Sequence, residues 1–153
     1  MSNSVFITPF NGHRPKIAPS AFVDISARLI GRVTVSENAS IWPGAVLRAD
    51  EEEIIIGNGS AVLDLCLLDA PHDYKVIVEP GALVSHSACL HGAIVKTGAL
   101  IGIGAIVLDG AVVEEGALVG AGAVVPPKMV VPAGMLMLGQ PAKPIRELRQ
   151  AEK

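Results

Sequence analysis

Residues 95–125 read VKTGALIGIGAIVLDGAVVEEGALVGAGAVV, with an aliphatic residue at every sixth position, from Val95 through Ile101 to Val125. The same period governs three earlier blocks of the chain. Their aliphatic positions are Ile17, Val23, Leu29, Val35, Ile41 and Leu47, then Ile56, Val62 and Leu68, then Val78, Val84 and Leu90. A period of six matches neither the roughly 3.6 residues per turn of an α-helix nor the two-residue alternation of a strand. The chain is therefore predicted to be a repeat protein built of hexapeptides.

Each hexapeptide carries a turn signal after its aliphatic residue. Four residues later the side chain is almost always small, as at Ala99 and Ala105, and the residue before that is most often glycine, as at Gly98 and Gly104. Glycine tolerates the positive φ that a sharp bend can require. Each repeat is thus predicted to be a short strand plus a corner, with three repeats in a triangular coil of about 18 residues. We expect an all-β solenoid, a left-handed parallel β-helix with the aliphatic residues stacked inside.

The 153 residues suffice for one domain, and we expect a single domain over 1–153 whose β-helix runs from about 10 to 140. The pattern changes near Pro141, where PAKPIRELRQAEK carries alternating charge with Ile145 and Leu148 three residues apart. This spacing predicts a C-terminal α-helix over about 142–152, packed along the outside of the prism.

Composition narrows the classes of partner. The net charge is −3 with both signs scattered, so we expect no basic stripe that would bind nucleic acid or anionic lipid. Apolar runs stay shorter than the roughly 18 residues of a membrane span, and the N-terminus does not have the pattern of a signal peptide. We expect a cytoplasmic protein with no nucleic-acid or membrane partner, and with Cys66 and Cys89 reduced.

The repeat is interrupted at 48–55, at 69–77 and by a one-residue shortening before Val95. Interruptions of a solenoid often carry function. Counting from the block starts places every interruption after a strand of the third face. The same register predicts two columns of stacked residues: Arg48, Asp69, His91 and Leu108 after the third-face strands, and Pro43, Asp64, His86 and Ile103 after the second-face strands.

The two columns suggest a metal site. Asp69 and His91 should be neighbours, whereas His86 should lie across one corner of the same coil, where a single prism cannot readily aim both histidines at one point. A threefold assembly would bring His86 of one chain to Asp69 and His91 of the next. Zinc accepts three such protein ligands with an open position for water, and Fe²⁺ or Co²⁺ would accept them too. The alternative is that His86 and His91 are ordinary interface histidines.

Four segments resemble the γ-class carbonic anhydrases and their relatives, the ferripyochelin-binding and carnitine-operon proteins. These are IWPGAVLRAD, VSHSACLHG, IGIGAIVLDGAVV and GQPAKPIREL. The resemblance implies a homotrimer with metal sites at the subunit interfaces, where zinc-bound hydroxide converts carbon dioxide, the small-molecule substrate, to bicarbonate. His86 and His91 match two of the family's three metal ligands. Arg48 and Asp50 match its Arg-x-Asp ion-pairing element.

Two departures from the family put efficient catalysis in doubt. Asp69 stands where the family has its first metal histidine, and Leu63 replaces a glutamine in the element Asn-x-Gln-Asp, whose acidic residue is matched by Asp64. A carboxylate in place of an imidazole lowers the site charge and should make bound water less acidic. His72 offers a replacement ligand or a proton shuttle, with a solvated loop histidine as its alternative. Asp64, which could orient His86, and Arg48 are the other candidate catalytic residues.

Three functions remain open on the sequence. The first is a zinc-binding trimer whose hydration activity is low or lost. The second is a hexapeptide acyltransferase that uses coenzyme A, against which stands the lack of a basic cluster that would hold a pyrophosphate. The third is a non-catalytic structural trimer with vestigial histidines. Coenzyme A binding and metal content would distinguish these functions.

Overall fold

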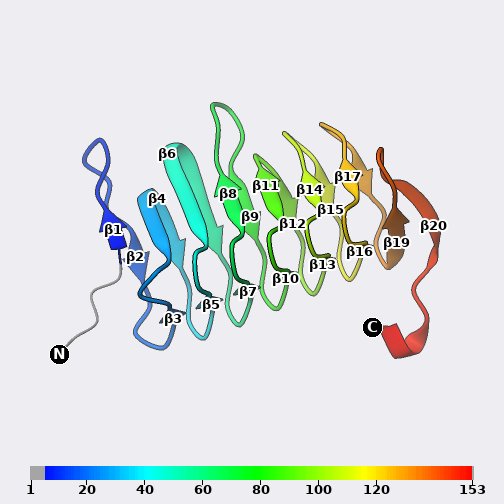
Figure 1. Ribbon diagram of the computed structural model, residues 1–153, viewed down its shortest axis with the longest axis horizontal. Coiled ribbons are helices and arrows are strands. Elements are labelled where there is room, and N and C mark those ends of the chain that lie inside the picture. Colours follow the sequence, from blue (N-terminus) through cyan, green and yellow to red (C-terminus); the bar gives the residue numbers. More distant parts are fainter. Residues whose placement is uncertain (1–5, 153) are drawn as a thin grey trace.

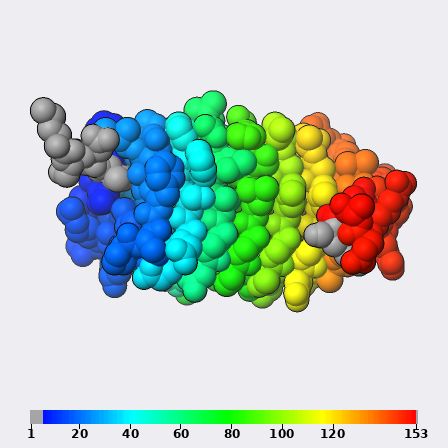
Figure 2. All heavy atoms as spheres, turned by 90° about the horizontal axis from the view of Figure 1, so that it is seen from below, coloured from blue at the N-terminus to red at the C-terminus, as the bar shows by residue number. Residues whose placement is uncertain are grey.

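The computed structural model describes residues 6–152 as an all-β solenoid of parallel strands with about seven turns. Figure 1 shows the coils stacked along one long axis, with β1 (Phe6–Thr8) and β20 (Lys143–Glu147) at opposite ends of the molecule. In Figure 2 the successive coils form bands that follow the order of the sequence. The prediction of a hexapeptide solenoid is confirmed.

The solenoid has three faces, and each face is a ladder of short parallel strands. The first face contains β2 (Lys16–Ile17), β9 (Val76–Val78), β12 (Ile94–Val95), β15 (Val112–Val113) and β18 (Val130–Val131). The second contains β3 (Phe22–Val23), β5 (Ser40–Ile41), β7 (Ala61–Val62), β10 (Leu83–Val84), β13 (Leu100–Ile101), β16 (Leu118–Val119) and β19 (Met135–Leu138). The third contains β1 (Phe6–Thr8), β8 (Leu67–Asp69), β11 (Cys89–His91), β14 (Ile106–Val107) and β17 (Val124–Val125).

Two long strands connect the third face to the first. The strands β4 (Arg28–Val35) and β6 (Val46–Ile56) continue round the corner, so these two faces form one 12-stranded sheet and the second face an 8-stranded one. The pairing of β4 with β6 shifts register between Gly31 and Val33. The sequence break at 48–55 is therefore a continuous strand, whereas the break at 69–77 is a true excursion between β8 and β9 that extends beyond the corner in Figure 1.

The core is a stack of the aliphatic residues that set the period. Val62, Val84 and Ile101 lie in register on the second face and are fully buried. Alanine fills most of the corners, because the three faces converge there and leave little room for a larger side chain. This geometry explains why aromatic residues make up only 3% of the chain.

The predicted C-terminal helix over 142–152 is wrong. The structure has β20 (Lys143–Glu147), which pairs antiparallel with β19, and then a single 3-10 turn, η1 (Gln150–Glu152). Pro141 and Pro144 disfavour a helix here, since proline has no N–H to donate within it. The last coil also leaves an unpaired strand edge, and β20 supplies partners for it. Leu148 still becomes buried, whereas Ile145 is exposed.

Among residues 6–152, the structure contains no helix long and apolar enough to cross a membrane.

Candidate metal centre

The predicted column on the third face is present. Asp69 in β8 pairs in register with Arg48 in β6 on one side and with His91 in β11 on the other. Parallel pairing stacks the side chains of such residues on the same side of the sheet. The register read from the hexapeptide count is thus confirmed.

Asp69 is the centre of this column. Its Oδ2 accepts a hydrogen bond of 2.9 Å from Arg48 Nη2 and lies 3.7 Å from His91 Nε2. Its Oδ1 is buried and has no hydrogen-bond partner among the described residues. Buried carboxylate oxygens nearly always have a partner, because losing water without replacement is costly. This oxygen therefore has an acceptor position to offer.

The other nitrogen of His91 is held by a residue that the sequence analysis did not identify. His91 Nδ1 contacts Oδ1 of Asp109, which lies in the turn of the next coil. A carboxylate there favours the proton on Nδ1 and leaves the Nε2 lone pair available. The available signal was that Asp109 directly follows Leu108, which continues the column one coil after His91.

The second column lies in the turns between the second and third faces. His86 Nδ1 is 3.0 Å from Asp64 Oδ2, as expected if Asp64 orients the His86 ring. The His86 side chain is half-exposed. Both histidines thus have Nδ1 beside a carboxylate, which favours a free Nε2 on each.

The donor set fits part of a metal site. Two nitrogen or oxygen ligands of one tetrahedral zinc lie about 3.3 Å apart, given bonds of about 2.0–2.1 Å. The 3.7 Å between Asp69 Oδ2 and His91 Nε2 is close to this separation, and Asp69 Oδ1 is unused. Within residues 6–152 of one chain, no group of three or more His, Cys, Asp or Glu side chains could hold a metal. The residues therefore fit two ligands of a site that needs a third from elsewhere.

His72 is not brought to this column within one chain. It lies on the excursion between β8 and β9, where its side chain is 81% exposed. Its backbone N–H donates to a carboxylate oxygen of Glu51 at 2.6 Å, and its Nε2 lies 3.6 Å from the carboxylate of Asp73. Its position matches the solvated loop histidine considered above.

The two cysteines do not supply a nucleophile. Burial raises the pKa of Cys66 to about 11, and its thiol donates to the Ser85 carbonyl at 2.9 Å. Burial, together with the nearby negative charge of Asp69, also raises the pKa of Cys89. Both thiols therefore stay protonated near neutral pH, and a thiol is a much weaker nucleophile than a thiolate.

Exposed aliphatic side chains surround the corner that carries His86. We call this surface the corner strip; it comprises Leu65, Leu67, Ile103 and Ile106. Leu65 is 67% exposed and holds a φ of 60°, where the repeat elsewhere uses mostly glycine. Leucine in this left-handed conformation is strained. A large apolar residue that is both strained and exposed indicates a role outside the isolated chain.

Known proteins show strong similarity over most of this chain. No family model matches it. A carbonic anhydrase of Geobacillus kaustophilus is 42% identical over 144 residues, covering 94% of this chain and 79% of the relative. The carnitine operon protein CaiE of Salmonella newport is 36% identical, covering 94% and 72% respectively. The chain belongs to the γ-carbonic anhydrase-like family of hexapeptide-repeat proteins. A Bacillus cereus structure of this fold, provisionally described as an acetyltransferase, superposes with a TM-score of 0.95 at 41% identity, covering 97% of this chain and 86% of that one.

Asp69 and Leu63 are the two residues that the sequence analysis expects to depart from the family's pattern. In the structure Asp69 forms an ion pair with Arg48. Arg48 Nε also lies 3.3 Å from Asp50 Oδ1, so one guanidinium pairs with a carboxylate in the column and with a second one beside it. Leu63 follows the second-face strand β7 and presents an aliphatic side chain that can neither donate nor accept a hydrogen bond.

Proposed function

We propose that this protein is a metal-dependent carbonic anhydrase-like enzyme that hydrates carbon dioxide with low activity, as a homotrimer of left-handed β-helices. His91 and Asp69 of one subunit and His86 of a neighbouring subunit would hold a zinc, ferrous or cobalt ion. The observation that carries the proposal is the matched pair of histidines, each with Nδ1 beside a carboxylate and Nε2 free. Paired orientation of this kind is typical of metal-ligating histidines.

The corner strip supports assembly of the metal site between subunits. Leu65, Leu67, Ile103 and Ile106 surround the turn of His86, so a second copy packed here would lie beside that histidine. Burying one leucine side chain contributes about 1.5–3 kcal/mol, which exceeds the roughly 1–2 kcal/mol that a left-handed conformation costs. The strain at Leu65 is thus offset in the trimer but not in a single chain.

When bound, the metal would supply a Lewis acid that makes water nucleophilic near neutral pH. The chain's own residues orient its ligands and tune its charge. Asp64 holds the His86 ring, and Asp109 holds the His91 ring. Arg48 pairs with Asp69 and offsets part of its negative charge. The corner strip provides an apolar wall that limits the access of bulk water.

Two residues account for the low activity that we propose. Asp69 brings a negative charge where the family has a neutral imidazole, which reduces the acidifying effect of a metal on water. Leu63 removes the amide that could position the attacking water, and orientation of reactants makes a large contribution to rate. Asp69→His together with Leu63→Gln should therefore raise carbon dioxide hydration by about tenfold or more.

The first experiment measures metal content and activity in matched variants. We expect about one metal per chain in the wild type by elemental analysis, with loss in His91→Ala and Asp69→Ala and retention in His72→Ala. Retention in Asp69→Ala with loss in His72→Ala would assign the third ligand to His72 instead. Absence of metal in every variant after incubation with zinc, and no carbon dioxide hydration, would overturn the proposal.

Coenzyme A-dependent acyl transfer is the second candidate, since the Bacillus cereus relative is provisionally described as an acetyltransferase. The second face has a groove of about 520 Å³ whose floor includes Leu83, Leu100 and Leu118. Glu115 and Glu152 also line it, and their negative charges oppose a pyrophosphate. We therefore expect coenzyme A to change the unfolding temperature no more than an equal concentration of inorganic phosphate does. A rise in that temperature that depends on ligand concentration would favour acyl transfer instead.

A further inference from the structure

A groove of about 570 Å³ lies at the N-terminal end of the solenoid, between the residues around Pro15 and the corner crossed by β4. Cationic side chains line it: Arg14, Lys16 and Arg32, together with the imidazole of His13. None of these residues belongs to the metal centre proposed above. Three cationic residues on one small groove stand out in a chain whose net charge is −3.

Two irregularities of the backbone shape this groove. Asn11 and Gly12 both have positive φ, and Phe10 and His13 exchange two backbone hydrogen bonds of 2.8 and 2.9 Å. This is the tight turn typical of an Asn-Gly hairpin, and it fixes His13 at the rim. On the other wall, Arg32 sits where the pairing of β4 with β6 shifts register. A register shift of this kind redirects a side chain out of the regular ladder.

The positive charge of the groove is not balanced by its own carboxylate. Among residues 6–152, Arg14, Lys16 and Arg32 form no ion pair with a carboxylate. Glu53 also lines the groove, but its Oε1 lies 2.6 Å from Nζ of Lys75. The charge of Glu53 is therefore largely matched by Lys75, which leaves an excess of positive charge on the groove.

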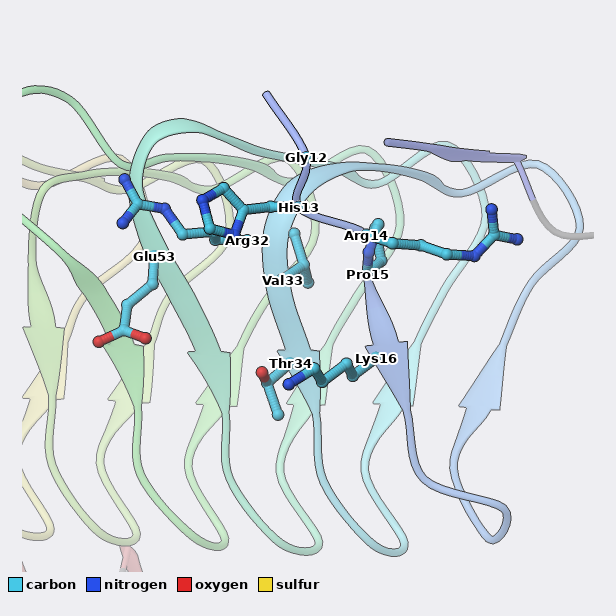
Figure 3. A pocket seen from close by; sticks show the side chains of 9 residues that line it. All are labelled: Gly12, His13, Arg14, Pro15, Lys16, Arg32, Val33, Thr34 and Glu53. Carbon is cyan, nitrogen blue, oxygen red and sulfur yellow. The ribbon is translucent and has the colours of Figure 1, made fainter. Parts of the chain in front are cut away.

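Arg32 provides a fixed donor. Its Nη2 donates to the backbone carbonyl of Glu51, which anchors the guanidinium. Its Nε is buried and has no hydrogen-bond partner among the described residues. A buried N–H without an acceptor is costly, and a ligand oxygen that reached it after a small shift of the side chain would relieve that cost. Figure 3 shows His13 and Arg32 together above Val33, with Lys16 and the Thr34 hydroxyl below and the Arg14 guanidinium directed away. Arg32 and His13 thus line one side of the groove, and Lys16 and Thr34 line another.

We propose that this groove binds a small oxyanion carrying two or more negative charges, either a phosphate ester or a polycarboxylate. Two cations on different sides of one groove favour a ligand with two or more negative charges, and the imidazole and hydroxyl add hydrogen bonds. Each bound oxyanion would contact Lys16 and Arg32 of one chain. The site therefore needs no second subunit and is independent of the metal centre.

Calorimetric titration tests the proposal with inorganic phosphate and with citrate, at constant ionic strength and neutral pH. We expect one of the two to bind once per chain in the wild type, with a dissociation constant in the range of about 0.1–1 mM. Lys16→Gln should weaken that binding about tenfold, since it removes one charge-assisted contact. Lys143→Gln is the matched control, because it removes the same charge from β20 at the other end of the solenoid.

The comparison of the two ligands identifies the source of the oxyanion, as preference for phosphate indicates a phosphate ester and preference for citrate a polycarboxylate. Arg32→Gln should also weaken binding. If Arg32→Gln unfolds because it loses the hydrogen bond to Glu51, Lys16→Gln alone tests the groove. His86→Ala should bind the anion as the wild type does. No binding of either anion up to about 10 mM, or equal weakening by Lys16→Gln and Lys143→Gln, would overturn the proposal.

Discussion

Two stretches of the same solenoid differ in what they carry. From Ile94 to Val131 each strand has two residues, and the buried positions are occupied by valine, isoleucine, alanine and glycine. From Val46 to Ala93 the strands reach 11 residues, an excursion leaves the corner, and Asp69 is buried in the column. The first stretch is regular in period and composition. The middle stretch keeps the stacking of the coils but departs from the repeat in both respects.

This difference shows where a repeat protein can place the polar residues of a functional site. In the regular stretch each coil satisfies the backbone of the next, and the side chains need only be aliphatic or small. Polar groups concentrate where the period breaks, because a broken coil frees side chains from the core pattern. Asp109 is the residue of the regular stretch that contacts the proposed metal centre, and it reaches His91 from a turn rather than from a strand.

The largest loss of stability should come from placing a methyl group between two coils of the regular stretch. A Cβ added at Gly102 would lie 2.6 Å from the backbone nitrogen of Ala121, whereas one added at Gly98 would meet nothing within 4 Å. Gly102→Ala should therefore lower the free energy of unfolding by about 3 kcal/mol or more. Gly98→Ala, at a φ of +65°, should cost only about 1 kcal/mol. Urea denaturation measures both, and equal losses would show that the close stacking of coils is not what limits this stretch.

A smaller effect should follow from breaking the contact between Asp109 and His91, which links the regular stretch to the middle stretch. Asp109→Asn cannot hold the His91 ring as a carboxylate does, so zinc affinity should fall about 10–100-fold. Glu114→Gln removes a carboxylate from the same stretch away from the column and is the matched control. Competition with a chelator of known affinity gives both values. If the two variants bind zinc equally, Asp109 has no part in orienting His91.

Relief of the strain in the middle stretch should change assembly more than folding. Leu65→Gly removes an exposed side chain from a left-handed residue, so the single chain should gain about 1 kcal/mol. The proposed trimer should dissociate about tenfold more readily, since it would lose a leucine side chain from its interface. Sedimentation equilibrium measures the dissociation, with Val130→Ala as a control on an exposed residue outside the corner strip. An unchanged dissociation constant would remove Leu65 from the interface.

The smallest effect concerns the end of the chain. Hydrogen bonding to Arg146 lowers the pKa of Glu152 from its ordinary value of 4.5 to about 2. Because the folded pKa lies below the unfolded one, this pair stabilises the C-terminal segment above about pH 4.5, and the contribution is lost as the pH falls towards 2. A carbon-13 NMR titration of the Glu152 carboxyl should show the low midpoint. Arg146→Gln should move it back towards 4.5, and a midpoint that does not move would exclude the pair as its cause.

The repeat made much of this structure predictable. Since the period fixes the register, Arg48, Asp69 and His91 could be placed in one column, and Asp64 beside His86, before any coordinates. The structure of the C-terminal segment, where the period ends, was not predicted. The segment from Ala142 became a strand because the last coil needed a partner, which a helical charge pattern does not express. Asp109 was not predicted because it lies one position beyond the column, in a turn of the regular stretch. The trimer that we propose cannot be derived from the register alone.

The reversed strand β20 also limits how the molecule can grow. An open parallel edge is self-complementary, so the last coil of one copy could template the first coil of another and build an endless filament. By running antiparallel to β19 and by carrying Pro144, which offers no N–H, β20 presents an edge on which a further parallel coil cannot form. Additional copies are thereby directed to the sides of the solenoid, where a closed ring of subunits has a finite size.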